Sequence, residues 1–467
     1  MLSKEFSAVH LIGIGGTGLS AIARVLLESG CQVSGSDQHL SPLARSLQEA
    51  GVQISVGHRA ENIQGAELVI RSSAIQDDNV EVQAALRAGI PVMKRAEFLG
   101  KLMENKMGIA IAGTHGKTTT TAMIAWLLTA LKQDPTYIIG GVSLNLGSNA
   151  HAGKGHAFVI EADEYDRMFL GLHPRVAAVT NIEYDHPDCY PTPEDFYSAF
   201  HDFVRGLAPQ GWLAACADDP GASRLAEEAR QEGYRVFTYG TTPGKADYLA
   251  QSIKVNPQGG FNFTGTYRGN SIGKVELQVP GAHNVRNALA ALLVAHQLEL
   301  PMALARKALE DFQGTGRRFE VRGEVDGVTV IDDYAHHPTE IRATLAAARV
   351  RYPQRRIWAI WQPHTYSRTQ TLFEAFASAF QEADQVVITE VYASRETAQV
   401  GKFSAAQFAG AMQNQAAFFA PRLEDAVDYL LDNLRTGDVM IVMSAGDADQ
   451  ISTQVLRALA ERKGLHV

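Results

Sequence analysis

The residues best suited to chemistry form a glycine-rich loop, Gly113-Thr-His-Gly-Lys-Thr118. An apolar run precedes it and a helical pattern follows. Backbone N–H groups at such a turn cradle phosphate oxygens; Lys117 adds a positive charge for the β- and γ-phosphates, and Thr118 offers a hydroxyl to Mg²⁺. The usual spacing places glycine where this chain has Ile111. The loop predicts ATP binding by Gly113, Thr114, His115, Gly116, Lys117, Thr118 and Thr119.

Carboxylates follow the next two apolar strands, in Glu161-Ala-Asp-Glu164 and Asn181-Ile-Glu-Tyr-Asp-His186. Open α/β sheets bind ligands at the carboxyl ends of their strands. We therefore expect Glu161 and His186, on adjacent strand ends, to lie over the same phosphate oxygens. Taken alone, the acids fit a solvated loop equally well. Following a phosphate loop, they predict a site for Mg²⁺ or Mn²⁺ with Thr118, Glu161 and His186 as ligands.

A second nucleotide motif, Gly13-x-Gly15-x-x-Gly18, lies near the N-terminus, and Asp37 follows at about the 20-residue interval expected for a ribose hydroxyl. Alone, it favours an NAD-dependent oxidoreductase. Physically, however, it supplies a helix N-terminus facing a diphosphate, which any nucleoside diphosphate can use. Beside an ATP loop, it predicts a substrate tagged with a nucleotide.

Two histidine-rich segments lie further along, Asp332-Asp-Tyr-Ala-His-His-Pro338 and Gln362-Pro-His-Thr-Tyr-Ser-Arg368. Each follows a predicted strand and leads into a helix. A lone histidine is more often structural than catalytic, but here several polar side chains share one predicted sheet edge. The guanidinium of Arg368 suits a substrate carboxylate, because it forms paired hydrogen bonds. The edge comprises Tyr334, His336, His337, His364 and Arg368.

Two further segments allow alternatives. His283-Asn-Val-Arg-Asn287 reads as a helix start, where Asn284 and Asn287 either cap the helix or recognise adenine. Arg317-Arg318 either reaches the ATP phosphates across a domain boundary or forms a solvated hinge.

The elements that position these residues form a three-domain α/β chain. A chain of 467 residues is longer than a domain with a single hydrophobic core, and apolar strands alternate with helical stretches throughout. We predict mostly parallel, doubly wound sheets in residues 1–107, 108–318 and 319–467, the second a P-loop domain. Residues 261–267 alternate with period two before a turn at 268–271, which predicts an antiparallel appendage on that domain.

Composition limits the partners. The net charge of −9 disfavours nucleic acid, and no window is apolar enough to span a membrane. Three dispersed cysteines, Cys31, Cys189 and Cys216, and a charged start without a signal peptide predict a cytoplasmic protein. The sequence leaves open whether it is a monomer or a homodimer.

Together the motifs resemble those of the Mur ligases of bacterial cell-wall synthesis, nearly end to end. The middle motifs are typical of the whole family, and Gly13-Ile-Gly-Gly-Thr-Gly18 with the two histidine-rich segments points to its alanine-adding branch. The resemblance also rests on Arg317-Arg-Phe-Glu320. It implies ATP-dependent ligation of L-alanine to the carboxylate of UDP-N-acetylmuramate through an acyl phosphate, in peptidoglycan precursor synthesis.

The resemblance implies roles by position. UDP would be held by Gly15, Gly16, Thr17, Gly18, Asp37, Ser72 and Ser73. Adenosine would lie near Asn284, Asn287 and Asp333, with Arg318 near the phosphates. The amino acid and the muramyl carboxylate would face Tyr334, His336, His364 and Arg368. The catalytic set would be Lys117, His186, His336 and Arg368.

Three differences bear on the branch. Later ligases of the family use a carbamoylated lysine after the Asp-His motif; this chain has no lysine between Lys154 and Lys245, which fits the alanine-adding type. Tyr165 stands where that type more usually has serine, and tyrosine occurs in the related ligase that recycles wall tripeptides. Ser444-Ala-Gly446 replaces a more glycine-rich turn. A recycling ligase is therefore an alternative; an NAD-dependent oxidoreductase and a P-loop ATPase switch are alternatives of other classes.

Overall fold

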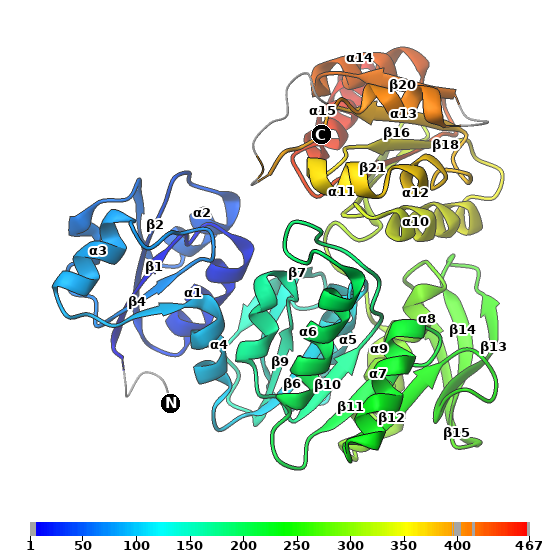
Figure 1. Ribbon diagram of the computed structural model, residues 1–467. Helices are drawn as coiled ribbons and strands as arrows, with labels where there is room; N and C mark the ends of the chain where they lie inside the picture. Colours follow the sequence, from blue (N-terminus) through cyan, green and yellow to red (C-terminus); the bar gives the residue numbers. More distant parts are fainter. Residues whose placement is uncertain (1–5, 395, 397–402, 413–415, 465–467) are drawn as a thin grey trace.

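The computed structural model describes residues 6–394, 396, 403–412 and 416–464. Three α/β units, each built on its own sheet, follow one another along the chain (Figure 1). The predicted fold class is confirmed, since most strand pairs in each sheet are parallel and helices alternate with the strands. The residue boundaries that we assign between domains remain a prediction.

The N-terminal sheet is wholly parallel, in the order β3-β2-β1-β4-β5. Its central strand β1 ends at Ile12, so the glycine motif emerges at the carboxyl edge, as expected for a nucleotide site. The elements are β1 (Ala8–Ile12), α1 (Thr17–Glu28), β2 (Gln32–Asp37), α2 (Pro42–Glu49), β3 (Gln53–Val56), the 3₁₀ helix η2 (Ala60–Ile63), β4 (Leu68–Arg71), α3 (Val80–Arg87), β5 (Val92–Lys94) and α4 (Arg95–Met103).

The central sheet has the order β15-β14-β13-β12-β11-β10-β6-β9-β7-β8. The predicted antiparallel appendage is confirmed, because β14 pairs antiparallel with both β13 and β15. The antiparallel pair β7–β8 at the other edge was not predicted. The elements are β6 (Met107–Ala112), α5 (Lys117–Ala130), β7 (Thr136–Ser143), β8 (Ser148–His151), β9 (Ala157–Glu161), the 3₁₀ helix η3 (Tyr165–Gly171), β10 (Val176–Val179), α6 (Pro193–Arg205), β11 (Trp212–Cys216), α7 (Pro220–Gln231), β12 (Arg235–Gly240), β13 (Tyr248–Val255), β14 (Phe261–Tyr267), β15 (Asn270–Leu277), α8 (His283–Gln297) and α9 (Met302–Glu310).

The C-terminal sheet has the order β16-β17-β21-β18-β19-β20, and only β16 runs antiparallel to its neighbour. Its helix α10 starts sharply, because Pro338 occupies the first helical position and the His337 side chain accepts a hydrogen bond from the Thr339 N–H. The elements are β16 (Glu320–Val325), β17 (Val328–Asp333), α10 (Pro338–Arg351), β18 (Ile357–Trp361), α11 (Tyr366–Thr371), α12 (Phe373–Ala377), β19 (Gln385–Thr389), α13 (Ala406–Ala411), β20 (Ala416–Ala420), α14 (Leu423–Asn433), β21 (Val439–Met443) and α15 (Asp449–Arg462).

The units differ in how they share their cores. One continuous apolar cluster runs through the N-terminal and central units, whereas the C-terminal unit has separate clusters of its own. Helix α1 packs on β7 and β8, and α4 packs on η3. The second contact is close: a Cβ on Gly100 would lie 2.3 Å from the Gly171 carbonyl oxygen. We call this apolar contact region the N-terminal seam.

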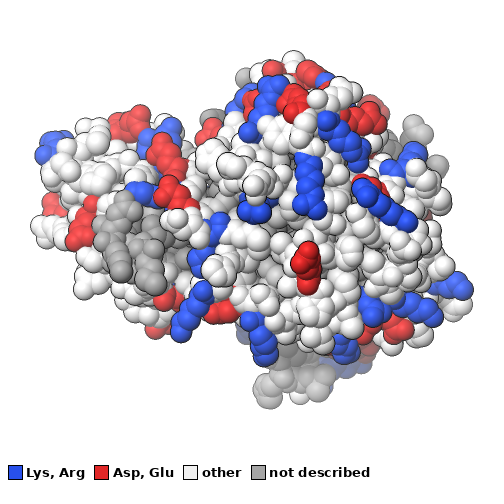
Figure 2. All heavy atoms as spheres, turned by 90° about the horizontal axis from the view of Figure 1, so that it is seen from below, with Lys and Arg blue, Asp and Glu red and all other residues white. Residues whose placement is uncertain are grey.

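Basic and acidic side chains are interspersed over the face in Figure 2. This distribution accords with the mixed, slightly acidic composition of the chain. None of the described helices has the length and apolarity needed to cross a bilayer.

Candidate active site

The phosphate loop has the backbone geometry that its glycines predict. Gly113 and Gly116 have φ angles of +136° and +81°, which favour glycine. A Cβ on Gly113 would lie 2.0 Å from the Thr180 hydroxyl. Ile111 stands where the usual motif has glycine. It is fully buried within β6, and the loop itself begins only at Gly113.

Lys117 lies inside this loop. Its Nζ donates hydrogen bonds to the carbonyl oxygens of Gly113 at 2.6 Å and Thr114 at 3.1 Å, and lies 2.8 Å from a carboxylate oxygen of Glu164. Burial alone would lower the pKa of Lys117, but the charges of Glu164 and Glu161 outweigh it and raise the pKa. The ammonium group therefore stays charged where phosphates would enter. The sequence reasoning gave Glu164 no role of its own, although it belongs to the acidic motif.

Glu161 and Thr118 fit a site for a hard cation. Glu161 is half-buried beside the loop and accepts a hydrogen bond from the Gly140 N–H at 2.7 Å. Burial raises its pKa, and a hydrogen bond with Thr118 partly offsets that effect. A carboxylate and a hydroxyl are oxygen ligands of the kind that Mg²⁺ prefers, and a bound cation would compensate the buried charge.

The expected adjacency of Glu161 and His186 is wrong. Strand β6, which carries the loop, lies between β9 and β10, so the two side chains approach the loop from opposite sides. His186 has a φ of +56° and lies with Nε2 3.6 Å from Glu164 and 3.7 Å from Asp185. His186 therefore approaches the phosphate loop from the side opposite Glu161, which lies with Thr118, and the role of the three residues as metal ligands stays a prediction.

A cavity opens beside the loop. It is lined by several residues predicted to bind ATP: His115, Gly116, Thr118, Thr119, Asn284, Asn287, Arg318 and Asp333. Helix α8 begins at His283 after Ala282, so Asn284 is not its cap. Instead Asn284 donates to the Pro280 carbonyl and accepts a hydrogen bond from Asn287, whose amide lies against Gly116. The amides thus join α8 to the loop at the cavity wall.

The predicted histidine edge also forms. The ring of His336 lies 5.4 Å from that of Tyr334 and 5.7 Å from that of His364. His336 Nδ1 donates to the Tyr334 carbonyl at 2.8 Å. Burial lowers the pKa of His336 to about 4. The imidazole is therefore neutral near pH 7, with its Nε2 lone pair available to a proton.

Arg368 forms a carboxylate pair within the protein. Its Nε and one terminal nitrogen donate to the two oxygens of Asp185 at 2.7 and 3.2 Å, and both side chains are almost wholly buried. The other terminal nitrogen lies 3.1 Å from His364 Nδ1. A substrate carboxylate at Arg368 would have to share it with Asp185, so that role stays a prediction. Sequence reasoning missed the pair because its members lie 183 residues apart.

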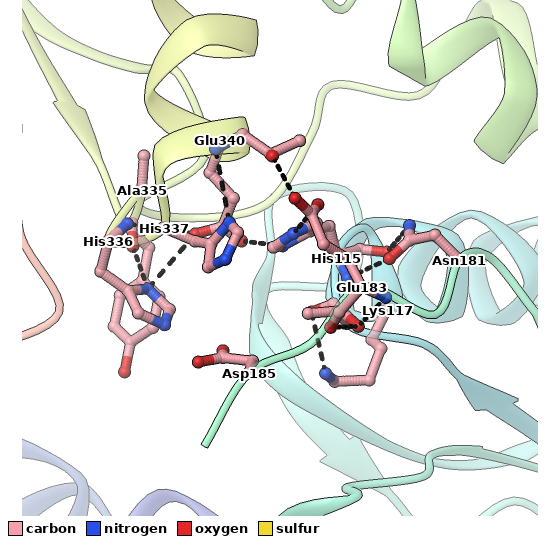
Figure 3. A network of polar contacts seen from close by, with 12 residues as sticks. His115, Lys117, Asn181, Glu183, Asp185, Ala335, His336, His337 and Glu340 are labelled. Carbon is pink, nitrogen blue, oxygen red and sulfur yellow. Dashed lines mark hydrogen bonds and ion pairs between the residues drawn. The ribbon is translucent and has the colours of Figure 1, made fainter. Parts of the chain in front are cut away.

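The central and C-terminal units meet through polar contacts, which we call the C-terminal seam. His115 lies between Glu183, at 3.0 Å from Nε2, and Glu340, at 3.2 Å from Nδ1 (Figure 3). Thr339 donates to the second oxygen of Glu183 at 2.7 Å. His115, Glu183 and His337 also bring three possible metal-ligand atoms within 4.8 Å of one another. The histidine of the phosphate loop is thereby bonded to both units.

A separate hollow lies in the N-terminal unit. Five residues that the sequence analysis placed at a diphosphate site line it: Gly13, Gly15, Gly16, Asp37 and Ser72. Asp37 already accepts a hydrogen bond from the Gly15 N–H at 2.9 Å. Thr17 and Gly18 begin α1 behind this hollow, and Ser73 follows Ser72. The lining also includes Ser41 and His58, which the sequence analysis did not select.

Comparison with known proteins places the chain in a family. Its residues 8–107, 111–295 and 317–446 match the models of the Mur ligase family catalytic domain, the Mur ligase middle domain and the Mur ligase glutamate ligase domain. The UDP-N-acetylmuramate–L-alanine ligase of Caldanaerobacter subterraneus is 40% identical over 97% of this chain and 98% of that protein. The chain belongs to the Mur ligase family. Family membership makes it an ATP-dependent, ADP-forming ligase and confirms the predicted resemblance.

Other similar proteins agree. The UDP-N-acetylmuramate–L-alanine ligase of Trichlorobacter lovleyi is 43% identical over 97% of this chain and 98% of its own. The UDP-N-acetylmuramate–alanine ligase structure of Thermotoga maritima has a TM-score of 0.83 at 30% identity, covering 97% of this chain and 99% of that one. A murein peptide ligase of Psychrobacter arcticus has a TM-score of 0.72 at 28% identity, with 97% and 98% covered. The oxidoreductase and ATPase-switch hypotheses are therefore wrong.

Proposed function

We propose that this chain joins L-alanine to the carboxylate of UDP-N-acetylmuramate at the expense of ATP. Full-length relatives at about 40% identity bear that name. The observation that carries the proposal is the C-terminal seam, where Glu340 joins His115 of the phosphate loop to the backbone of His336, a neutral and largely buried histidine of the other unit. That arrangement brings the means of activating a carboxylate next to a group suited to receiving a proton from an amine.

In the first step, an oxygen of the substrate carboxylate attacks the γ-phosphorus of ATP and ADP leaves. The products are an acyl phosphate and ADP, so the carboxyl carbon becomes electrophilic. Lys117, positively charged within the loop, stabilises the negative charge that develops on the phosphoryl oxygens. Thr118 and Glu161 would hold Mg²⁺, which supplies further charge neutralisation when bound.

In the second step, the neutral amine of alanine attacks the acyl carbon and phosphate leaves. The amine loses a proton as the amide forms, and His336 is our candidate acceptor. Its Nδ1–H is held by the Tyr334 carbonyl, so the lone pair lies on Nε2. With a pKa near 4, His336 is a weak base, and we assign it to orienting the amine as much as to deprotonating it.

The N-terminal hollow would take the UDP portion of the substrate. Backbone N–H groups follow β1 at the start of α1, where a diphosphate is favoured, and Asp37 stands near enough to accept a ribose hydroxyl once freed from Gly15. Closure of the units around the reacting groups would exclude water, which otherwise hydrolyses the acyl phosphate. We place this reaction in the cytoplasm.

A second candidate, ligation of a murein tripeptide to the same acceptor, follows from Tyr165. Its hydroxyl donates to Asp188 at 3.2 Å, and its ring lies 5.2 Å from His186, beside the phosphate loop. The residue is therefore in the right region to influence the choice of amine. The greater similarity of the alanine ligases favours alanine.

The test is phosphate release measured with UDP-N-acetylmuramate, L-alanine and ATP, omitting each in turn. We expect release only when all three are present, with UDP-N-acetylmuramoyl-alanine formed in equal amount. Phosphate release that ignores either the acceptor or the amine would refute the proposal. Faster reaction with L-alanyl-γ-D-glutamyl-diaminopimelate than with alanine would establish the recycling function instead.

A further inference from the structure

We infer that His115 and Glu340 form a positioning pair that couples the phosphate loop to the amino-acid edge of the C-terminal unit. This inference rests on the proposed function and adds a task for two residues beyond binding ATP. Neither touches the reacting atoms by our account. They act through the groups that they hold.

The contacts of Glu340 show what is coupled. One carboxylate oxygen lies 3.2 Å from His115 Nδ1 and 3.5 Å from a guanidinium nitrogen of Arg318. The other accepts the backbone N–H of His336 at 3.1 Å and lies 3.3 Å from the ring Nδ1 of the same residue. A single, largely buried carboxylate therefore contacts the phosphate loop, Arg318 and the candidate proton acceptor. Figure 3 shows Glu340 with His115 and His336.

The contacts of His115 complete the bridge on the central side. Its ring nitrogens face Glu183 and Glu340, which belong to different units, and its ring lies 4.7 Å from that of His337. The carboxylates of Glu340, which is largely buried, and Glu183, which is 40% exposed, repel each other unless a cation separates them. Burial would lower the pKa of His115, but hydrogen bonds to Glu183 and Glu340 raise it to about 9. The protonated ring is thus the cation that lets the two units approach.

The consequence concerns timing. His115 lies two residues before Lys117, in the loop that we predict to bind the ATP phosphates. Docking of α10 on the loop through His115 and Glu340 also fixes the backbone of His336, the candidate acceptor for the proton of the amine, at the C-terminal seam. If the pair is broken, the first step can proceed while the amine site is poorly placed. The acyl phosphate is then exposed to water, and ATP is consumed without product.

The experiment compares His115→Asn, Glu340→Gln and the double variant. For each we measure kcat, the KM of alanine and of ATP, and the ratio of phosphate released to peptide formed. We expect kcat/KM for alanine to fall about 10- to 100-fold in each single variant, and KM for ATP to change by less than about threefold in Glu340→Gln, whose residue lies outside the loop. The phosphate-to-peptide ratio, near one in the native chain, should rise at least about twofold.

The double variant separates coupling from local stability. Glu340 also lies in the first turn of α10, where a carboxylate stabilises the helix N-terminus. If that were its only task, the losses of the single variants would multiply. If the two residues act as a positioning pair, kcat/KM for alanine in the double variant should lie within about threefold of its value in the less active single variant. Should His115→Asn fail to bind ATP, Glu340→Gln carries the test, since it lies outside the loop.

A matched control exists in the same chain. His151 also lies between two carboxylates, Glu28 at 2.8 Å and Asp134 at 3.3 Å, and also joins two units, but it is 42% exposed. His151→Asn should leave kcat and the phosphate-to-peptide ratio within about twofold of native. Multiplicative losses, an unchanged ratio in the pair variants, or an equal effect at His151 would overturn the inference. Absence of alanine-dependent product in the native chain would instead refute the proposed function.

Discussion

The two seams of this molecule differ in the kind of contact that they bury. The interior of the N-terminal seam is part of one apolar core, with α1 on β7 and β8 and α4 close enough to η3 to require Gly100, and its ion pairs, such as Glu28 with His151, are partly exposed. The C-terminal seam consists of ions and hydrogen bonds: His115 lies between Glu183 and Glu340, and Arg368 pairs with Asp185, with all of these side chains largely buried except Glu183. Both seams join α/β units of similar design.

The difference indicates different tasks. Apolar burial is favourable in many arrangements and needs no partner geometry, so it suits units that stay together. Buried ion pairs contribute little net stability, because desolvation offsets their attraction, but they demand one geometry and fail when it is lost. We therefore expect the N-terminal seam to hold the acceptor unit in place and the C-terminal seam to form and open around the reaction.

The largest expected effect comes from the loop at the C-terminal seam. Lys117→Ala removes the charge that stabilises the transferring phosphate and leaves Glu164 buried without its partner. We expect kcat to fall at least about 1,000-fold, while binding of UDP-N-acetylmuramate at the N-terminal hollow, measured by calorimetry, changes less than about threefold. If the Lys117→Ala variant kept most of the ligation rate, Lys117 would not have the role that we give it.

The next effect should appear in stability rather than rate. Phe98 on α4 is fully buried in the shared core. Phe98→Ala should lower the free energy of unfolding by about 3–4 kcal/mol through lost burial and a residual cavity. In scanning calorimetry, the N-terminal and central units should still unfold together, at a lower temperature, and the C-terminal unit separately. Unfolding of all three units in one transition would contradict the contrast between the seams.

A smaller effect tests the ion pair at Arg368. Arg368→Lys keeps the charge but loses the paired hydrogen bonds to Asp185 and the contact with His364. We expect docking of the C-terminal unit to weaken by about 2–3 kcal/mol. Amide hydrogen exchange should become faster in α10 and α11, and its rate in α1 should not change. Faster exchange spread evenly over both seams would show that they are not independent.

The smallest expected effect is a dependence on pH. The pKa of His115 is raised to about 9, because its bonds to Glu183 and Glu340 outweigh burial, so its stabilisation is complete below pH 6.5 and lost as pH rises through 9. The pKa of Glu183 is lowered to about 2, its bond with His115 outweighing burial, so its stabilisation holds above pH 4.5 and fades as pH falls through 2. The C-terminal transition should lose up to about 2 kcal/mol between pH 7 and 9. His115→Asn should abolish that loss, and a loss retained in this variant would point to another group.

Sequence reasoning predicted the fold well where local patterns carry it. The apolar runs before Gly13 and Gly113 form the strands expected, and the alternation at 261–267 forms the antiparallel appendage. It did not predict β7 and β8, where Gly140 and Gly141 interrupt the apolar run. Sequence reasoning also could not predict the strand order, because no local sequence pattern shows that β6 lies between β9 and β10. For that reason the expected adjacency of Glu161 and His186 was wrong.

At the candidate site, the polar residues that the motifs singled out do gather around the loop, the cavity and the histidine edge. Their partners were harder to find. Glu164, Asp185 and Glu340 all stand inside or beside quoted motifs, yet no spacing rule links Asp185 to Arg368 or His115 to Glu340. Such pairs depend on two units meeting, which leaves no periodic trace in either segment.

By itself, the sequence of this protein determined the ATP loop, the three α/β units and the family, because each follows from short segments whose spacing has one physical use. The tertiary structure alone decided which charges face each other. His115 became a bridge, and Arg368 acquired a carboxylate partner, only when α10 and α11 came to lie on the central unit. Electrostatic partners depend on distances of a few ångströms between distant segments, and burial then makes those few contacts decisive.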